Sequence, residues 1–176
     1  FDTVKGSDYL ADQKAVLLMT ELGPGCVIEM EHWGCPFSRN EDGRIAQRPF
    51  GGAGFPRCCY SADITGHVLL HTLYEQVVRF EHASEREEMT VYEEYFVLKV
   101  VIEDNTVRGV IALNIHTGEL EIFQTEAIIF ATGGIGRIYR ETTNALINTG
   151  LGMCIPYFEG EPLKDMEFVQ FHPTSL

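Results

Sequence analysis

The stretch IIFATGGIGRIYRETTNALINTG (residues 128–150) indicates the fold class. The residues from Ala127 to Ala131 are all apolar, which is typical of a strand that is covered on both faces in an α/β sheet. Gly133 and Gly134 follow at the carboxyl edge, where open α/β sheets bind cofactors. Glycine removes the Cβ that keeps a flat or phosphorylated ligand at a distance. The pattern therefore predicts an α/β fold whose backbone approaches a cofactor at these glycines.

The glycines by themselves leave a second interpretation open, which is a tight turn with nothing bound. Gly134, Gly136 and Tyr139 fail the third position of the G-x-G-x-x-G dinucleotide motif. The strand, loop and acidic residue of that motif do not stand in their usual relation either. The choice between turn and cofactor site depends on the residues around the stretch.

The composition indicates a globular protein with a sizeable core. The chain has 176 residues, of which 45% are hydrophobic, and no low-complexity tract or linker divides it. A formal net charge of −13, spread along the chain, argues against nucleic acid or an anionic membrane surface as a partner. No apolar run approaches the roughly 20 residues that cross a bilayer. Because the chain begins at Phe1 and ends after a Pro-Thr-Ser turn signal, we expect an internal piece of a longer protein.

The cysteines and histidines do not predict a metal site. The five cysteines form no C-x-x-C pair and no Cys/His cluster, which is typical of reduced thiols in a cytosolic compartment. His67 and His71 lie one turn apart on an expected helix, and no third ligand accompanies them. We therefore expect a packed or solvated histidine pair.

The first half of the chain has helical patterns on either side of a long loop. Ser7 is a candidate cap for a helix that ends at Gly23-Pro24-Gly25, and a short second helix is expected over residues 27–33. Residues 34–57 are rich in glycine and proline and predict a long loop, which in a compact domain is usually functional or disordered. Helical spacing resumes at Thr65, with Asp63 or Thr65 as the cap.

The second half reads as β structure. Alternating and β-branched residues predict a β-meander with strands within residues 89–103, 107–115 and 120–131. The turns between them are expected at 104–106 and 116–119. A further strand is expected over residues 166–171.

Six segments along the chain are informative together: FDTVKGSDYLADQ (1–13), EHWGCPFSRNEDGRIAQRPFGG (31–52), SADITGHVLLHTLYEQ (61–76), IIFATGGIGRIY (128–139), TTNALINTG (142–150) and PLKDMEFVQFHPTSL (162–176). Together they resemble one protein family, the flavoprotein subunit of succinate dehydrogenase and fumarate reductase. The resemblance covers nearly the whole chain. It implies part of an FAD-binding doubly wound α/β domain with a β-meander (1–172), ending at the start of an inserted capping domain (173–176).

The resemblance also implies the cofactor and its contacts. FAD is expected beside the turn after the apolar strand, along one strand of the meander, and at the loop that follows the glycine turn. The implied cofactor-binding residues are Phe96, Val97, Leu98, Ala131, Thr132, Gly133, Gly134, Asn148, Thr149 and Gly150. In this family a histidine upstream of the chain carries FAD covalently.

His172 and Phe50 are the site residues that the resemblance implies for the substrate. His172, in QFHPT, matches the catalytic histidine that hydrogen-bonds a carboxylate of succinate or fumarate. Phe50, in RPFGG, matches the aromatic residue that packs over the dicarboxylate. A dianion needs donors at both ends, and an apolar cover excludes water during hydride transfer. Apart from the resemblance, His172 reads as a half-buried histidine and Phe50 as a loop anchor.

The family further implies electron transfer to an iron–sulfur subunit of a respiratory complex, complex II of the tricarboxylic acid cycle. Membrane anchor subunits are indirect partners, and no nucleic acid is expected. The location implied is peripheral, on the cytoplasmic face of the cell membrane or the matrix side of the mitochondrial inner membrane.

The sequence departs from the family after Gly150. The family usually reads Thr-Gly-Asp-Gly there, with an FAD-binding aspartate, whereas Gly150 is followed directly by Leu151. Pro156 is expected to interrupt a segment that should be helical. The N-terminal glycine-rich motif and the substrate-binding arginines have no counterpart in these residues. Two alternatives therefore stay open: an L-aspartate oxidase-like flavoenzyme, and a non-catalytic binding or assembly module derived from the fold.

Overall fold

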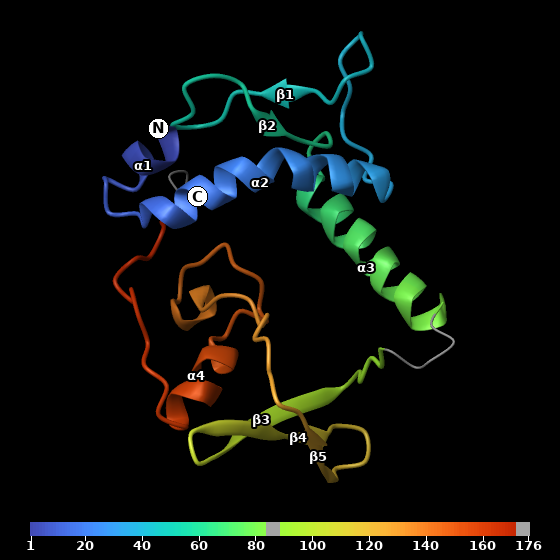
Figure 1. Ribbon diagram of the computed structural model, residues 1–176, viewed down its shortest axis with the longest axis vertical. Coiled ribbons are helices and arrows are strands. Elements are labelled where there is room, and N and C mark those ends of the chain that lie inside the picture. The colour runs from blue at the N-terminus through green and yellow to red at the C-terminus, as the bar shows by residue number, and fades with distance from the viewer. Residues whose placement is uncertain (84–88, 172–176) are drawn as a thin grey trace. The chain divides into compact units, whose positions relative to one another are not determined.

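The computed structural model describes residues 1–83 and 89–171. The described chain forms two compact units, Phe1–Val91 and Tyr92–Leu176 (Figure 1). His172 and the expected start of a capping domain at 173–176 lie outside the described residues. The expected domain boundary at residue 172 thus stays a prediction.

The first unit begins with two helices, α1 (Asp2–Gly6) and α2 (Gln13–His32). Asp12 caps α2, since its Oδ1 accepts hydrogen bonds from the backbone N–H groups of Lys14 at 2.8 Å and Ala15 at 3.3 Å. The prediction that Ser7 caps this helix was wrong. Ser7 follows the end of α1, where its hydroxyl donates to the carbonyl of Val4 at 2.8 Å.

The predicted end of the helix at Gly23-Pro24-Gly25 was also wrong, because α2 continues through Pro24 to His32. The expected second helix at 27–33 is the last part of α2. A proline inside a helix removes one backbone hydrogen bond and crowds the preceding turn. The backbone hydrogen bonds of the residues after Pro24 offset that local loss. They continue to the end of the helix, where the Trp33 N–H donates to the Glu29 carbonyl.

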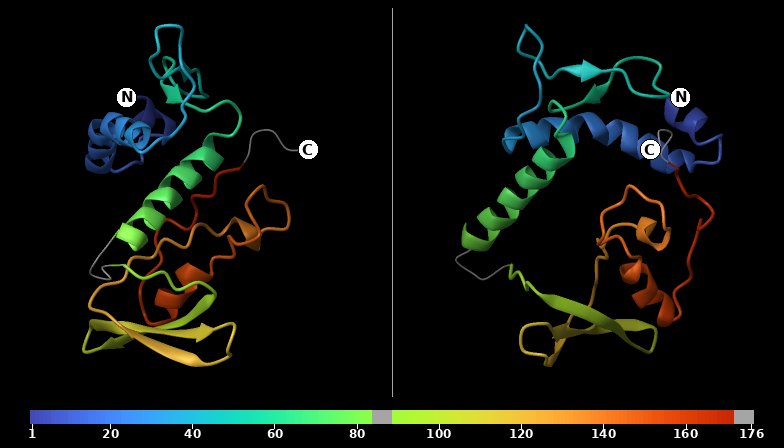
Figure 2. Two further views of the ribbon diagram at one scale, coloured as in Figure 1. Left: turned by 90° about the vertical axis from the view of Figure 1, so that its right-hand side faces the viewer. Right: turned by 180° about the vertical axis from the view of Figure 1, so that it is seen from behind.

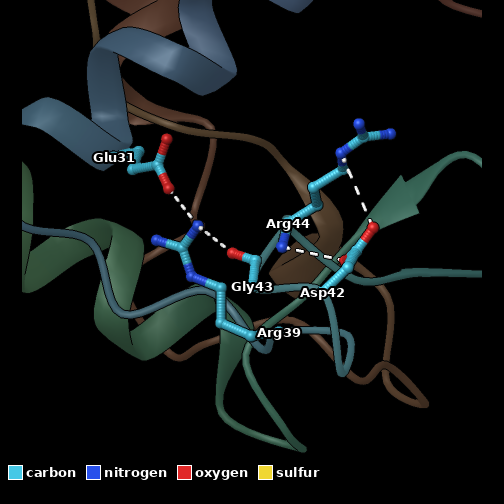
Figure 3. A network of polar contacts seen from close by, with 5 residues as sticks. All are labelled: Glu31, Arg39, Asp42, Gly43 and Arg44. Carbon is cyan, nitrogen blue, oxygen red and sulfur yellow. Dashed lines mark hydrogen bonds and ion pairs between the residues drawn. The ribbon is translucent and has the colours of Figure 1, made fainter.

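The predicted long loop follows α2. Its regular structure is a two-residue ladder, β1 (Gln47–Arg48) paired with β2 (Cys58–Cys59), and an isolated bridge between Arg39 and Ile45. Figure 3 shows how its first part is tied to α2. Arg39 forms an ion pair with Glu31 and donates to the Gly43 carbonyl at 3.3 Å. The Arg44 N–H bonds the Asp42 carboxylate at 3.1 Å. These side chains act together with backbone hydrogen bonds, such as the one from the Ala46 N–H to the Ser38 carbonyl at 2.7 Å, to hold the loop.

The helix predicted from Thr65 is confirmed as α3 (Thr65–Ala83). Thr65 Oγ1 accepts a hydrogen bond from the Ser61 N–H at 3.1 Å, which anchors the preceding turn. Buried Thr72 satisfies its hydroxyl by donating to the Val68 carbonyl at 2.8 Å. The rings of His67 and His71 are both exposed and lie with their centroids 4.2 Å apart, which fits the expected packed or solvated pair.

The second unit contains the predicted β-meander, which is confirmed. Its strands are β3 (Tyr95–Glu103), β4 (Thr106–Asn114) and β5 (Leu120–Gln124), antiparallel and in the order β3-β4-β5. Asp104 and Asn105 have φ values of 50° and 56°, the left-handed conformation that a two-residue hairpin turn requires. The turns predicted from Asp-Asn and Thr-Gly are thus where the strands reverse.

A short helix, α4 (Leu151–Phe158), packs against β3 (Figure 2). The core of this unit contains Ile155 from α4 with Val100 and Ala112 from the sheet. The prediction that Pro156 interrupts the helix was wrong. Pro156 is near the end of α4, so the one N–H that it lacks costs little, while Cys154 still bonds the Gly150 carbonyl at 3.2 Å.

Two predicted strands are absent from the described residues. Residues 127–131 and 166–171 form neither a strand nor a helix, and the side chain of Ile129 is 92% exposed. An apolar segment becomes a strand only where a neighbouring backbone completes its hydrogen bonds. No strand among the described residues pairs with either segment, so both predictions were wrong for this structure.

Candidate functional site

The glycine turn at residues 131–134 lies against residues 148–152, which lead into the start of α4. A Cβ at Gly133 would come within 2.8 Å of Asn148 Oδ1, and one at Gly150 within 3.0 Å of the Ile135 side chain. A Cβ at Gly152 would clash with Thr132. The structure therefore brings together two of the segments predicted to bind the cofactor, 131–134 and 148–150.

Gly134 differs from the other glycines of this turn. A Cβ at Gly134 would meet no atom within 4 Å, and its φ is not positive. Among the described residues, no hydrogen bond engages the backbone N–H groups of Thr132, Gly133 or Gly134. The turn thus presents free donors beside a position without a side chain, which suits a flat or anionic ligand.

Asn144 is a residue that the sequence did not single out. Its side chain occupies the space that a Cβ at Gly136 would need. Asn144 Oδ1 accepts a hydrogen bond from Asn148 Nδ2 at 3.2 Å, and its own Nδ2 donates to Thr142 Oγ1 at 3.2 Å. The Arg137 N–H then bonds the Asn148 carbonyl at 2.9 Å. The spacing of Asn144 and Asn148, four residues apart beside a glycine turn, is the signal that could have indicated this network.

The third predicted cofactor segment, Phe96 to Leu98, is in β3, one of the two edge strands of the sheet in the described part of the chain. Among the described residues, one side of its backbone has no sheet partner. The register shifts between Val97 and Lys99, so Leu98 is the extra residue of a β-bulge. Bulges at sheet edges often redirect a strand next to a binding site. Lys99 pairs with Glu159 at 3.3 Å and ties the strand to the end of α4.

A polar network fixes the start of β3. The Tyr95 hydroxyl donates to Glu121 Oε1 at 2.8 Å and accepts from Asn114 Nδ2 at 3.0 Å. The bond to Glu121 and partial burial raise the pKa of the Tyr95 phenol above its ordinary value. This network joins all three strands immediately before Phe96 and so sets the register of the segment.

Phe50 lies in the first unit, in the loop between β1 and β2, and its side chain is 67% exposed. The Ala53 N–H bonds the Phe50 carbonyl at 3.1 Å, which closes a turn directly after it. Asp2 binds the far side of this loop, accepting from the Gly54 N–H at 2.6 Å and from Arg57 Nη2 at 2.5 Å. The Gly54 bond and the Arg57 guanidinium hold the pKa of the Asp2 carboxyl below its ordinary value.

Among residues 1–83 and 89–171, no group of three His, Cys, Asp or Glu side chains is placed to hold a metal ion. In the same part of the chain, none of the helices is long and apolar enough to span a bilayer. The described cysteines carry no disulfide.

Comparison with known proteins identifies the family. The sequence pattern of the FAD binding domain matches residues 1–176. The chain belongs to the FAD binding domain family. The glycine turn at Thr132–Gly134 fits this family's cofactor. FAD combines a pyrophosphate, which accepts hydrogen bonds, with flat rings, which can approach a backbone that carries no side chain.

The curated proteins that this chain resembles are longer. The chain is 45% identical, over 99% of its length, to the fumarate reductase flavoprotein subunit of Mycobacterium tuberculosis. It is 49% identical, over 100% of its length, to the succinate dehydrogenase flavoprotein subunit of Coxiella burnetii. The chain spans 29% of the first protein and 30% of the second.

Solved structures have the same fold over this chain. The structure of E. coli quinol fumarate reductase matches 99% of this chain and 29% of that one, with a TM-score of 0.93 at 42% identity. The Mycobacterium smegmatis Sdh1 complex matches 98% of this chain and 30% of that one, with a TM-score of 0.92 at 32% identity. The predicted fold class, part of an α/β FAD-binding domain, is confirmed.

Proposed function

We propose that this chain is part of a flavoprotein subunit that oxidises succinate to fumarate, or catalyses the reverse reaction, and passes electrons to an iron–sulfur subunit. The observation that carries the proposal is the identity of 45–49% along the whole chain to proteins of that name. The bare turn at Gly134 supports it, because the cofactor of that reaction needs such a surface.

Three segments of the chain hold FAD in this proposal. The N–H groups of Thr132 to Gly134 face the flavin side, Asn148 to Gly150 face the ribityl and pyrophosphate region, and the edge of β3 from Phe96 to Leu98 passes the adenine end. Ala131 joins the first of these segments. When bound, FAD supplies the acceptor for a hydride from succinate. The role of the protein is to place that acceptor and to keep water out.

His172 and Phe50 act on the dicarboxylate. His172 donates a hydrogen bond to one carboxylate and so orients the substrate. Phe50 covers the substrate with an apolar ring, which its exposure on a tethered loop permits. The proton and the other carboxylate are handled by residues that these segments do not contain.

The attachment of FAD to a histidine outside this chain, the iron–sulfur clusters of a partner and the membrane anchor subunits complete the proposed complex. Its expected place is peripheral, on the cytoplasmic face of the cell membrane or the matrix side of the mitochondrial inner membrane. The names of the solved relatives, which are a quinol-fumarate reductase with menaquinol and an Sdh1 complex, support such an assembly.

A non-catalytic binding module is the second candidate, favoured by one observation. Leu151 stands directly after Gly150, where the resemblance leads one to expect an aspartate that binds FAD. Flavin content separates the two candidates. A functional subunit is yellow after purification and keeps flavin on the polypeptide after acid precipitation, whereas a non-catalytic module carries none. An L-aspartate oxidase-like enzyme would instead release its flavin and oxidise aspartate with oxygen.

His172→Ala in the complete subunit tests the substrate site. A charge-assisted hydrogen bond contributes about 1.5–3 kcal/mol, so kcat/KM for succinate should fall roughly 10- to 150-fold. The binding of malonate, which presents the same carboxylate, should weaken in parallel while flavin content and Tm hold. Steady-state oxidation with a dye acceptor and malonate titration of the flavin spectrum measure both. Unchanged malonate affinity would place the substrate elsewhere.

A further inference from the structure

The loop that carries Phe50 is closed at its base by β1 and β2. Arg48 pairs with Cys58 and Gln47 with Cys59 in the antiparallel ladder. The Arg48 guanidinium lies over the ring of Tyr60, 4.7 Å from its centroid. Phe50 is therefore only two residues beyond a fixed stem.

A turn inside the loop sets the backbone at Phe50. The Ala53 N–H bonds the Phe50 carbonyl, and Gly52 has a φ of +77°, a conformation that other residues adopt at a cost. The Phe50 side chain projects from this turn and is 67% exposed. The turn by itself fixes the shape of the loop but not its position on the unit.

Asp2 supplies the missing attachment from a distant part of the sequence. A single carboxylate oxygen, Oδ2, accepts from the Gly54 N–H at 2.6 Å and from Arg57 Nη2 at 2.5 Å. The Asp2 side chain is 17% exposed and Arg57 is 40% exposed, so solvent competes only partly for this pair. The Arg57 guanidinium also lies 5.0 Å from the centroid of the Phe55 ring. Hydrogen bonds to an ionised group are the stronger kind.

We propose that Asp2 is a positioning residue for substrate binding: it clamps the loop of residues 49–57 to α1 and so holds Phe50 where it covers the dicarboxylate. The inference rests on the role of Phe50 in the proposed function. The carboxylate is ionised at neutral pH, because both of its partners lower its pKa. Loss of the clamp frees the Gly54 to Arg57 side of the loop while leaving the cofactor residues of the second unit intact.

The test compares substitutions at Asp2 in the complete flavoprotein. Asp2→Asn keeps an oxygen for the Gly54 N–H but loses the charge, whereas Asp2→Ala loses both contacts. We expect the malonate dissociation constant, from titration of the flavin spectrum, to rise roughly 3- to 10-fold in Asp2→Asn and further in Asp2→Ala. KM for succinate should rise more than kcat falls, and flavin content should stay at the wild-type level.

Asp8→Asn is the matched control. Asp8 is an exposed carboxylate of the same segment with a φ of 52°, a conformation that Asn also tolerates. Its side chain makes no hydrogen bond or ion pair to any described residue. The malonate affinity of Asp8→Asn should equal that of the wild type.

A double variant of Asp2 and Phe50 tests whether Asp2 acts by positioning Phe50 or only by stabilising the fold. If Asp2 acts through Phe50, the double variant Asp2→Ala/Phe50→Ala binds malonate no more weakly than Phe50→Ala alone. Two results would overturn the inference. One is a malonate dissociation constant in the double variant that rises by the product of the two single effects. The other is an unchanged malonate affinity in Asp2→Ala while Phe50→Ala weakens binding. Unchanged affinity in Phe50→Ala would instead contradict the role of Phe50 in the proposed function, and with it the consequence of the clamp for substrate.

Limited trypsin digestion gives a readout that does not depend on substrate. Trypsin cleaves after Arg57, whereas Pro49 protects the bond after Arg48. Release of the Arg57 guanidinium in Asp2→Asn should speed cleavage at residue 57, and Asp8→Asn should not. An unchanged cleavage rate in both variants would show that Asp2 does not hold the loop.

Discussion

Two pairs of adjacent glycines lie in the two units, Gly51-Gly52 in the Phe50 loop and Gly133-Gly134 in the cofactor turn. In each pair one glycine has a positive φ, +77° at Gly52 and +73° at Gly133. Their surroundings differ. A Cβ at either residue of the first pair would meet nothing within 4 Å, whereas a Cβ at Gly133 would lie 2.8 Å from Asn148.

The difference separates three reasons for a glycine. Gly52 is required by backbone conformation, and Gly133 by conformation together with close packing of the chain on itself. Gly134 is explained by neither, because its φ is ordinary and its surroundings are open. Gly51 shares both properties, so they do not by themselves mark a ligand site, and a bound ligand is the reason that the proposed function gives for glycine at position 134. The following predictions test this division and the Asp2 contacts, and they run from the largest expected effect to the smallest.

Gly152→Ala should have the largest effect. The new Cβ would clash with Thr132, whose own Cβ is fixed to the backbone of the cofactor turn. Overpacking costs about 1–3 kcal/mol, which exceeds the up to about 1 kcal/mol that Ala gains in a helix. Tm and flavin content of the complete subunit should both fall.

Gly25→Ala in α2 is the control for this substitution. It is also a glycine within a helix, but a Cβ there meets nothing within 4 Å. Its Tm should hold or rise. A fall in Gly25→Ala as large as that in Gly152→Ala would mean that packing against Thr132 is not the cause.

Gly133→Ala should cost more than Gly52→Ala. Both place a Cβ at a positive φ, which costs about 1–2 kcal/mol. Gly133→Ala also displaces the side chain of Asn148, whereas Gly52→Ala displaces nothing. The free energies of unfolding measure the difference, and Asn148→Gly in both backgrounds should remove it. If Gly133→Ala and Gly52→Ala lowered the free energy of unfolding equally while Asn148 was present, the packing role of Asn148 would be contradicted.

Gly134→Val should leave the free energy of unfolding of the flavin-free protein nearly unchanged, because the space is open. Its flavin content should nevertheless fall, to about half of wild type or less, since the branched side chain occupies ligand space. The ratio of flavin absorbance to protein measures this. If a folded Gly134→Val protein carried as much flavin as the wild type, the alternative interpretation of a tight turn with nothing bound would be favoured.

The smallest effect concerns Asp2 and pH. Its folded pKa lies below the ordinary value of 3.8, so its contribution to stability is complete above that pH and is lost as pH falls through the folded pKa. Unfolding monitored between about pH 5 and pH 2 should show a shallower loss of stability in Asp2→Asn than in the wild type. Parallel curves for the two proteins would mean that the carboxylate is not held in its ionised form.

The elements that the sequence predicted correctly are those whose signals are local. α3 follows from apolar residues at helical spacing, and the meander follows from alternating strands around Asp104-Asn105 and Gly118. The loop of residues 34–57 follows from its glycines and prolines. The same local rules failed at Pro24, because one proline removes a single hydrogen bond and the rest of the 20-residue helix α2 offsets it.

What the sequence determined by itself is the class of element along much of the chain and the family, and it supplied the segments that we propose for FAD. Only the tertiary structure decided which glycine faces which neighbour, that Asn144 and Asn148 brace the turn, and that Asp2 reaches Gly54 and Arg57. It also left residues 127–131 unpaired, although they are as apolar as a buried strand. The reason is physical: helix periods and turns depend on residues near in sequence, whereas strand pairing, glycine packing and the Asp2 bonds depend on groups that meet only after folding.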